Sequence, residues 1–348
     1  MSPPNTSGPS GSSQALLLLL GGLAGLGAAE LTLRGLGTGL PHLGIFSEEG
    51  GQLRLLPDAS AQVRRADGEG YTVETDQRGW RRGPRSAGCS WLVVGDSQAM
   101  GSGVEAEYSF GGRLGACVAA VPGHGIVDAL AAVPTPAPEG VLGVVLVANQ
   151  ANDWDEGLVP ALDRYAVRGG WLVTRSRADS WTAAVWGSRL SRSHVAHLLG
   201  SLLLGGLFAP DAAVPLWTDP GATNPVSVAI AGAIHSFAVS RPELRVVVAW
   251  LPVDVAMVAR DDSPFTEAAR EARAPVLGDP RIRDQLFGAL TTRELPPGVG
   301  PVDRVDLGEV LAGQADAFLR YDYHMSERGH ELVATRLAAA LGLSPKEP

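Results

Sequence analysis

The sequence predicts an α/β fold: a three-layer α/β/α sandwich around a mostly parallel central sheet. Over residues 89–342, short Val-rich apolar runs alternate with segments of helical pattern. The runs are continuously apolar, as in strands that are covered on both faces. The helical segments between them supply the crossover connections that a parallel sheet needs. In such sheets, ligands bind beyond the carboxyl ends of the strands.

The expected elements follow in chain order. Tyr71–Thr75 alternates between apolar and polar residues and predicts an edge strand within a Gly/Pro-rich lead-in, residues 35–88. A helix is expected over 108–120, after the first buried strand. A last helix is expected to end at Leu341, with Ser326 as its N-cap. The apolar runs expected to form strands are 91–94, 140–148, 244–251 and 302–307, and 116–121 is a further short apolar run.

The N-terminus has its own organisation. Residues 1–14 are rich in Ser, Pro and Gly and are expected to be disordered, and a short tail is expected at 343–348. The apolar segment 15–34 reaches the roughly 20 residues that span a bilayer. It fits a membrane anchor, a cleavable signal peptide or a buried helix, and the lack of preceding Lys or Arg disfavours the signal peptide.

We predict a membrane anchor that contacts the bilayer through residues 15–33, with the following domain outside the cytoplasm. Arg34, taken alone, favours the opposite orientation under the positive-inside rule.

Charge and cysteine content narrow the classes of partner. The net charge is −9, and among the 28 basic residues the one Lys is Lys346. Without a dense basic cluster, nucleic acid is not an expected partner. The Arg pairs at 64–65 and 81–82 are interpreted as solvated loop charges. Cys89 and Cys117 are open to two interpretations, a disulfide or two buried thiols, and they lack the His partner of a zinc site.

A candidate nucleophile follows the first buried strand. The apolar run at 91–94 ends in Gly95-Asp96-Ser97, so that Ser97 lies at the tip of the predicted sheet. A serine there can attack an acyl carbon, and its own backbone N–H then faces the resulting oxyanion. The alternative is an ordinary turn in which Ser97 or Asp96 caps a helix.

A candidate base lies far away in the sequence. His324 comes just before the last predicted helix, in a loop where an imidazole can reach a site, and Asp322 lies two residues upstream. Taken alone, these residues are better explained as ordinary polar loop residues.

Several motifs, in order, together resemble the SGNH/GDSL hydrolase superfamily. The first is Gly95-Asp96-Ser97 with Gly101-Ser-Gly-Val104 behind it, and Gly123 stands where the second motif supplies its glycine. Gln150-Ala-Asn-Asp153 is similar to the third motif, and Asp322-Tyr-His324, followed by Gly329-His330, is similar to the last. The apolar start and the turn Asp76-Gln-Arg-Gly-Trp-Arg81 resemble membrane-tethered bacterial members. The resemblance covers residues 89–342 and implies a flavodoxin-like fold of SGNH hydrolase type.

The resemblance also implies roles for individual residues. Ser97 would be the nucleophile, His324 the general base and acid, and Asp322 the residue that orients His324. The oxyanion would be held by the backbone N–H groups of Ser97 and Gly123 and by the side-chain amide of Asn152. No metal or organic cofactor is implied.

Two departures from the family pattern stand out. The usual motif has Asp three residues before His, where this chain has Tyr321; the Asp-x-His spacing is closer to proteins that O-acetylate exopolysaccharides. A backbone carbonyl is therefore an alternative to Asp322 for orienting His324. Gln150 replaces the Gly of the third motif.

The predicted function is that of a serine esterase acting through a Ser acyl-enzyme on acyl esters, O-acetyl esters first among them, with carbohydrate among the candidate substrates. One alternative is a polysaccharide O-acyltransferase on the same machinery, and another is an inactive membrane-tethered binding or scaffold protein. A phosphate or nucleotide binder suits the sheet, but the chain lacks a Gly-rich loop with Lys. The sequence does not select the acyl group, the acceptor or the oligomeric state.

Overall fold

The fold is known from a computed structural model. The residues that it describes are 11–35, 43–65, 68–84, 88–150, 153, 157–179, 193–195, 225–252, 280–314, 316–319 and 323–344.

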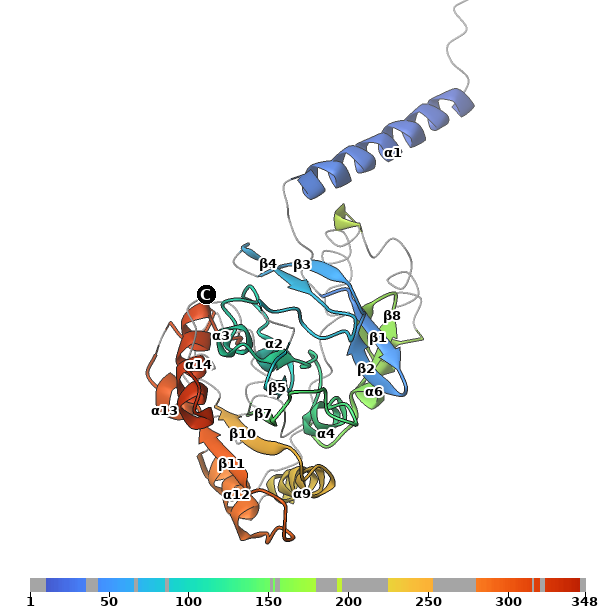
Figure 1. Ribbon diagram of the computed structural model, residues 1–348. Helices are drawn as coiled ribbons and strands as arrows, with labels where there is room; N and C mark the ends of the chain where they lie inside the picture. The colour runs from blue at the N-terminus through green and yellow to red at the C-terminus, as the bar shows by residue number, and fades with distance from the viewer. Residues whose placement is uncertain are drawn as a thin grey trace, which may run out of the picture.

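A five-stranded sheet, in which every strand pair is parallel, forms the centre of the fold (Figure 1). The strand order is β11-β10-β7-β5-β6, which in chain order is 2-1-3-4-5. That order is one of the two common doubly wound arrangements, and its switch point lies between the first and third strands. The predicted α/β fold with a parallel sheet is therefore confirmed. The strands are β5 (Trp91–Val94), β6 (Cys117–Val118), β7 (Gly143–Asn149), β10 (Arg245–Leu251) and β11 (Val302–Asp306).

Helices flank the sheet, and alternate residues of each strand contact different sets of them. In β7, Val145 and Val147 join a core with α3 (Phe110–Leu114) and α14 (Glu327–Leu341). Val144 and Leu146 of the same strand join a second core with α4, α9 and α12. This two-sided burial explains why β7 is continuously apolar. The finer prediction, a three-layer sandwich of SGNH hydrolase type, stays a prediction. The helices of the second core are α4 (Ile126–Ala131), α9 (Pro225–Ser240) and α12 (Pro280–Thr292).

The observed elements follow the predicted ones with one clear error. Strand β5 has the predicted bounds, and α14 begins after Ser326, whose side chain accepts a hydrogen bond from Gly329 N. The helix predicted over 108–120 is wrong, because α3 ends at Leu114. Gly115 adopts the left-handed conformation (φ 65°) that terminates helices, and the chain then enters β6. A short helix, α13 (Gly308–Leu311), contacts α14.

Antiparallel hairpins add to the sheet domain. The predicted edge strand at 71–75 is observed as β4, which pairs with β3. Side chains of β2, β3 and β4 belong to the same core as Val145 and Val147, so the lead-in packs on the sheet domain. The hairpins are β1 (Phe46–Glu49) with β2 (Gln52–Leu55), β3 (Ser60–Arg64) with β4 (Gly70–Glu74), and β8 (Tyr165–Arg168) with β9 (Trp171–Thr174), flanked by α6 (Ala161–Arg164) and the 3-10 helix η1 (Arg175–Arg177).

The N-terminal helix α1 (Gly11–Gly35) corrects a prediction. It begins inside the segment expected to be disordered and extends away from the sheet domain (Figure 1). Within the described residues, no helix has the length and apolar content needed to cross a membrane. The predicted membrane anchor at 15–34, the membrane contact through 15–33, and the localisation that followed from them are therefore wrong. Glu30 of α1 accepts hydrogen bonds from Ser193 Oγ and Val195 N.

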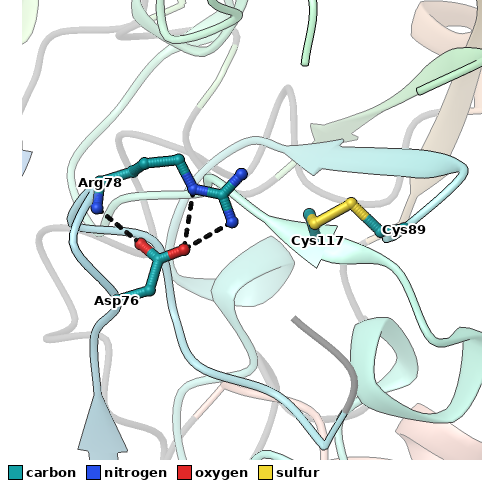
Figure 2. The surroundings of a disulfide bond; sticks show 4 residues. All are labelled: Asp76, Arg78, Cys89 and Cys117. Carbon is teal, nitrogen blue, oxygen red and sulfur yellow. Dashed lines mark hydrogen bonds and ion pairs between the residues drawn. A yellow bond between two sulfur atoms is a disulfide. The ribbon is translucent and has the colours of Figure 1, made fainter. Parts of the chain in front are cut away.

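The two cysteines form a disulfide, which decides between the two interpretations left open by the sequence. Cys89 lies just before β5, and Cys117 begins the neighbouring strand β6 (Figure 2). The two Cα atoms are 5.6 Å apart, within the usual range for a disulfide. The bond therefore joins the starts of two adjacent parallel strands.

Candidate active site

The turn after β5 brings Ser97 to the edge of the sheet. Strand β5 ends at Val94, and α2 (Ser97–Met100) begins three residues later. Gly95 has φ 148°, and a Cβ at this position would lie 2.7 Å from the Cβ of Ala99 and 3.2 Å from the carbonyl oxygen of Val147. A residue without a side chain is therefore required for the chain to turn this sharply into α2.

Asp96 fixes this turn to the neighbouring strand. Its Oδ1 accepts hydrogen bonds from Gln98 N at 2.9 Å and Ala99 N at 3.4 Å, which makes it the N-cap of α2. Its Oδ2 accepts a hydrogen bond from Asn149 Nδ2 at 2.7 Å. Since Asn149 is the last residue of β7, Asp96 joins the carboxyl ends of the two strands that flank the switch point.

His324 lies against Ser97. Its Nε2 atom is 2.8 Å from Ser97 Oγ, within hydrogen-bond distance. Ser97 is 8% exposed and His324 is half-buried, so the hydroxyl is shielded on most sides. The ring of Tyr323 stacks on the imidazole, with centroids 4.6 Å apart. When the imidazole carries its proton on Nδ1, Nε2 is the acceptor for the proton of the hydroxyl.

Described residues on either side of 320–322 are hydrogen-bonded to each other next to His324. Leu319 N donates to His324 O at 2.9 Å, and Phe318 and Met325 form an isolated antiparallel bridge. Leu319 packs on Gly103, which has φ 96° and where a Cβ would lie 2.6 Å from Leu319 Cδ1. The glycine behind the nucleophile therefore lets Leu319 approach the end of β5.

Arg81 supports the segment behind α2, contrary to its interpretation as a solvated charge. It is only 3% exposed, and its guanidinium donates to the carbonyl oxygens of Met100 at 2.8 Å, Gly101 at 2.6 Å and Val104 at 2.6 Å. Burial lowers the pKa of Arg81 to about 10, so the group stays charged at neutral pH. The planar guanidinium has several N–H donors and can therefore bind the three carbonyl oxygens at once.

The turn at 76–81 explains how Arg81 reaches that position. Asp76 Oδ1 accepts hydrogen bonds from Arg78 N at 2.9 Å and Trp80 N at 3.0 Å, and its other oxygen pairs with the Arg78 guanidinium (Figure 2). Gly79 has φ 75°, and a Cβ there would lie 2.3 Å from the carbonyl oxygen of Leu55. Arg81 then forms an isolated antiparallel bridge with Val118 of β6.

The remaining predicted site residues fall into two groups. Gly123 lies within the described residues. Val121 N donates a hydrogen bond to Gly95 O at 3.1 Å. Gly123 follows Val121 by two residues, and Ser97 follows Gly95 by two residues. The Gly123 carbonyl accepts a hydrogen bond from Arg164 at 2.8 Å. Asn152 and Asp322 lie outside the described residues.

Two further histidines are buried near this edge of the sheet. The Nε2 atom of His124 is 2.8 Å from the carbonyl oxygen of Leu53, and burial lowers the pKa of the imidazole. His330 accepts a hydrogen bond from Phe110 N at 3.4 Å, and burial, reinforced by the charge of Arg81, lowers its pKa to about 3. Both rings are therefore neutral at physiological pH.

Gln98, which was not among the predicted site residues, is 2% exposed and is hydrogen-bonded to the backbone on both sides of His324. Its position beside Ser97 was the one available signal. Over the described ranges, no three His, Cys, Asp or Glu side chains are grouped so that they could hold a metal ion.

Comparison with known proteins adds little to this geometry. No family model matches the chain, and no curated protein matches it. The resemblance to the SGNH/GDSL superfamily therefore rests on the sequence motifs alone.

Among solved structures, the chain is similar to a protein from Streptococcus pneumonia whose name refers to platelet activating factor. That match has a TM-score of 0.40 and 12% identity, and covers 73% of this chain and 85% of the other. A second solved structure has a TM-score of 0.34 and 14% identity, with 73% and 97% of the two chains covered. Likeness at this level leaves the function to be argued from the site itself.

Proposed function

We propose that this chain is a serine hydrolase of the kind its motifs resemble, which cleaves an acyl ester through an acyl-enzyme on Ser97. The observation that carries the proposal is the 2.8 Å distance between Ser97 Oγ and His324 Nε2. A nucleophile within hydrogen-bond reach of its base, at the carboxyl end of a parallel strand, is the arrangement that acyl transfer needs.

The proposed reaction has two halves. Ser97 Oγ attacks the acyl carbon as its proton moves to His324 Nε2, and the bond to the alcohol oxygen breaks as that proton passes to the leaving alcohol. Water then attacks the acyl-enzyme, gives a proton to His324, and releases the acid as the proton returns to Ser97 Oγ. Removal of either partner stops the same step, so both single variants should fail together.

Three further roles belong to the proposal. The backbone N–H of Ser97 is the first of α2 and has no intrahelical acceptor, which suits it to hold an oxyanion. Gly123 N–H and the Asn152 side-chain amide are the proposed partners in this role. Asp322 is the proposed residue that orients His324, with a backbone carbonyl as the alternative.

The test is phosphonylation of Ser97 by a fluorophosphonate probe on the full chain. Ser97 Oγ displaces fluoride from phosphorus, and the labelled peptide is identified by mass spectrometry. We expect labelling in the wild type and none in Ser97→Ala or His324→Ala. Hydrolysis of p-nitrophenyl acetate should follow the same pattern.

Matched controls are available on α9, which packs in the other core. Ser227→Ala and His235→Ala make the same chemical changes away from Ser97 and should label like the wild type. A folded wild type that labels no faster than Ser97→Ala would overturn the proposal. Labelling with acetyl transfer to a sugar hydroxyl, in place of water, would redirect it to an O-acyltransferase.

A further inference from the structure

Gln98 follows Ser97 directly and contacts the loop of the candidate base from inside the fold. Its side chain is 2% exposed, and α2 directs it toward the turn that carries His324. A buried amide must satisfy both its donor and its acceptor to avoid a large desolvation cost. Where those partners lie therefore indicates what the residue does.

Both ends of the Gln98 amide bind backbone groups on either side of His324. Nε2 donates to the carbonyl oxygen of Tyr323 at 2.8 Å, and Oε1 accepts from Met325 N at 3.1 Å. A side chain that binds the residues before and after His324 fixes the position of the Cα between them. Since Gln98 is adjacent to Ser97, the short helix α2 carries both the candidate nucleophile and the side chain that holds the backbone around the candidate base.

We propose that Gln98 is a positioning residue that sets the distance between His324 and Ser97. The expected effect on the reaction rate rests on the proposed function. The expected effect on the position of His324 does not. An error of about 1 Å in the placement of a catalytic group can cost on the order of a hundred-fold in rate. Gln98 is not expected to touch substrate.

Two substitutions test the two hydrogen bonds. Gln98→Met keeps the approximate length and removes both bonds. Gln98→Glu keeps an acceptor for Met325 N but sets a second acceptor against the carbonyl of Tyr323. We expect each variant to be phosphonylated by the fluorophosphonate about a hundred-fold more slowly than the wild type. Its saturation constant for the probe should change little.

A pH series separates positioning from simple loss of stability. When the introduced carboxyl of Gln98→Glu is protonated, it can again donate to Tyr323 O and accept from Met325 N. The ratio of the Gln98→Glu rate to the wild-type rate should therefore rise as the pH falls, whereas the Gln98→Met ratio should stay flat. Ile234→Val, a change in the buried core of α9, serves as the destabilised control and should label at the wild-type rate.

A second readout does not depend on turnover. The ring ¹⁵N resonances of His324, assigned by comparison with His324→Ala, report the hydrogen bond to Ser97 Oγ. Ser97→Ala should shift them, and Gln98→Met should produce a shift of the same kind in a protein that remains folded. If the wild type does not label at all, the proposed function fails, and the resonances alone then decide the positioning role.

Two results would overturn the inference. One is wild-type labelling by Gln98→Met. The other is a set of His324 resonances that Ser97→Ala moves and Gln98→Met leaves in place.

Discussion

His324 Nε2 lies 2.8 Å from Ser97 Oγ, although the two residues are 227 positions apart in the chain. Ser97 follows the first strand of the parallel sheet, and His324 precedes the last helix. Their contact therefore depends on the packing of α14 and its preceding loop against the turn after β5. Changes in the residues that fix these two segments should affect stability and reactivity to different degrees.

Asp96→Ala should lower both stability and labelling. The change removes the N-cap of α2 and the acceptor for Asn149 Nδ2, so we expect a loss of about 1–3 kcal/mol in the free energy of unfolding, measured by urea denaturation. Ser109→Ala, which removes the N-cap of α3, is the matched control and should cost roughly 1 kcal/mol without slowing phosphonylation. Equal labelling by both variants would contradict the role given to Asp96.

Arg81→Met should be among the most destabilising substitutions in the chain. Three buried carbonyl oxygens lose their donor, at about 1–3 kcal/mol each, so the expected loss is at least about 3 kcal/mol by urea denaturation. Arg82→Met, at an exposed neighbour, should change the free energy of unfolding by less than about 0.5 kcal/mol. Similar losses in the two variants would restore the interpretation of Arg81 as a solvated charge.

His330 should make the fold sensitive to acid. Its pKa is about 3 in the folded chain, against about 6.5 when unfolded. Above the unfolded pKa the ring is neutral in both states and contributes no pH dependence. Between pH values of about 6.5 and 3 the unfolded chain binds more protons, so the free energy of unfolding falls as the pH falls, by up to about 1.4 kcal/mol per pH unit.

The slope of stability against pH isolates this effect. His330→Asn keeps an acceptor for Phe110 N but does not titrate, so its unfolding free energy should fall less steeply between pH 6.5 and 4 than that of the wild type. His124 has a lowered pKa for the same reason and should account for part of the remaining slope. Parallel curves for wild type and variant would exclude His330 as a source.

Reduction of the Cys89–Cys117 disulfide should destabilise the fold. The bond closes a loop of sequence separation 28, for which chain entropy predicts about 3–4 kcal/mol. We expect dithiothreitol to lower the free energy of unfolding by that amount, and the double variant Cys89→Ser/Cys117→Ser to match the reduced wild type. A reductant effect of the same size on the double variant would show that the bond is not its cause.

Features that depend on local patterns could be predicted from the amino-acid sequence. Continuous Val-rich runs were enough to predict a buried parallel sheet, because a strand covered on both faces needs apolar residues at every position. Ser326 was enough to place the start of α14, because an N-cap is a local hydrogen bond. The motif around Ser97 and the loop of His324 were also identified from sequence, as candidates for one site.

The pairing of groups that are distant along the chain depends on the packed fold. The helix predicted over 108–120 was wrong because a Gly115 cap and pairing of β6 with β5 outweighed the local helical pattern. Arg81 looked like a solvated charge because nothing in its neighbourhood along the chain shows the three carbonyls that it binds. The bonds of Gln98 and the 2.8 Å contact between His324 and Ser97 likewise join segments more than 200 residues apart. Such contacts arise from packing of the whole core, which no local pattern encodes.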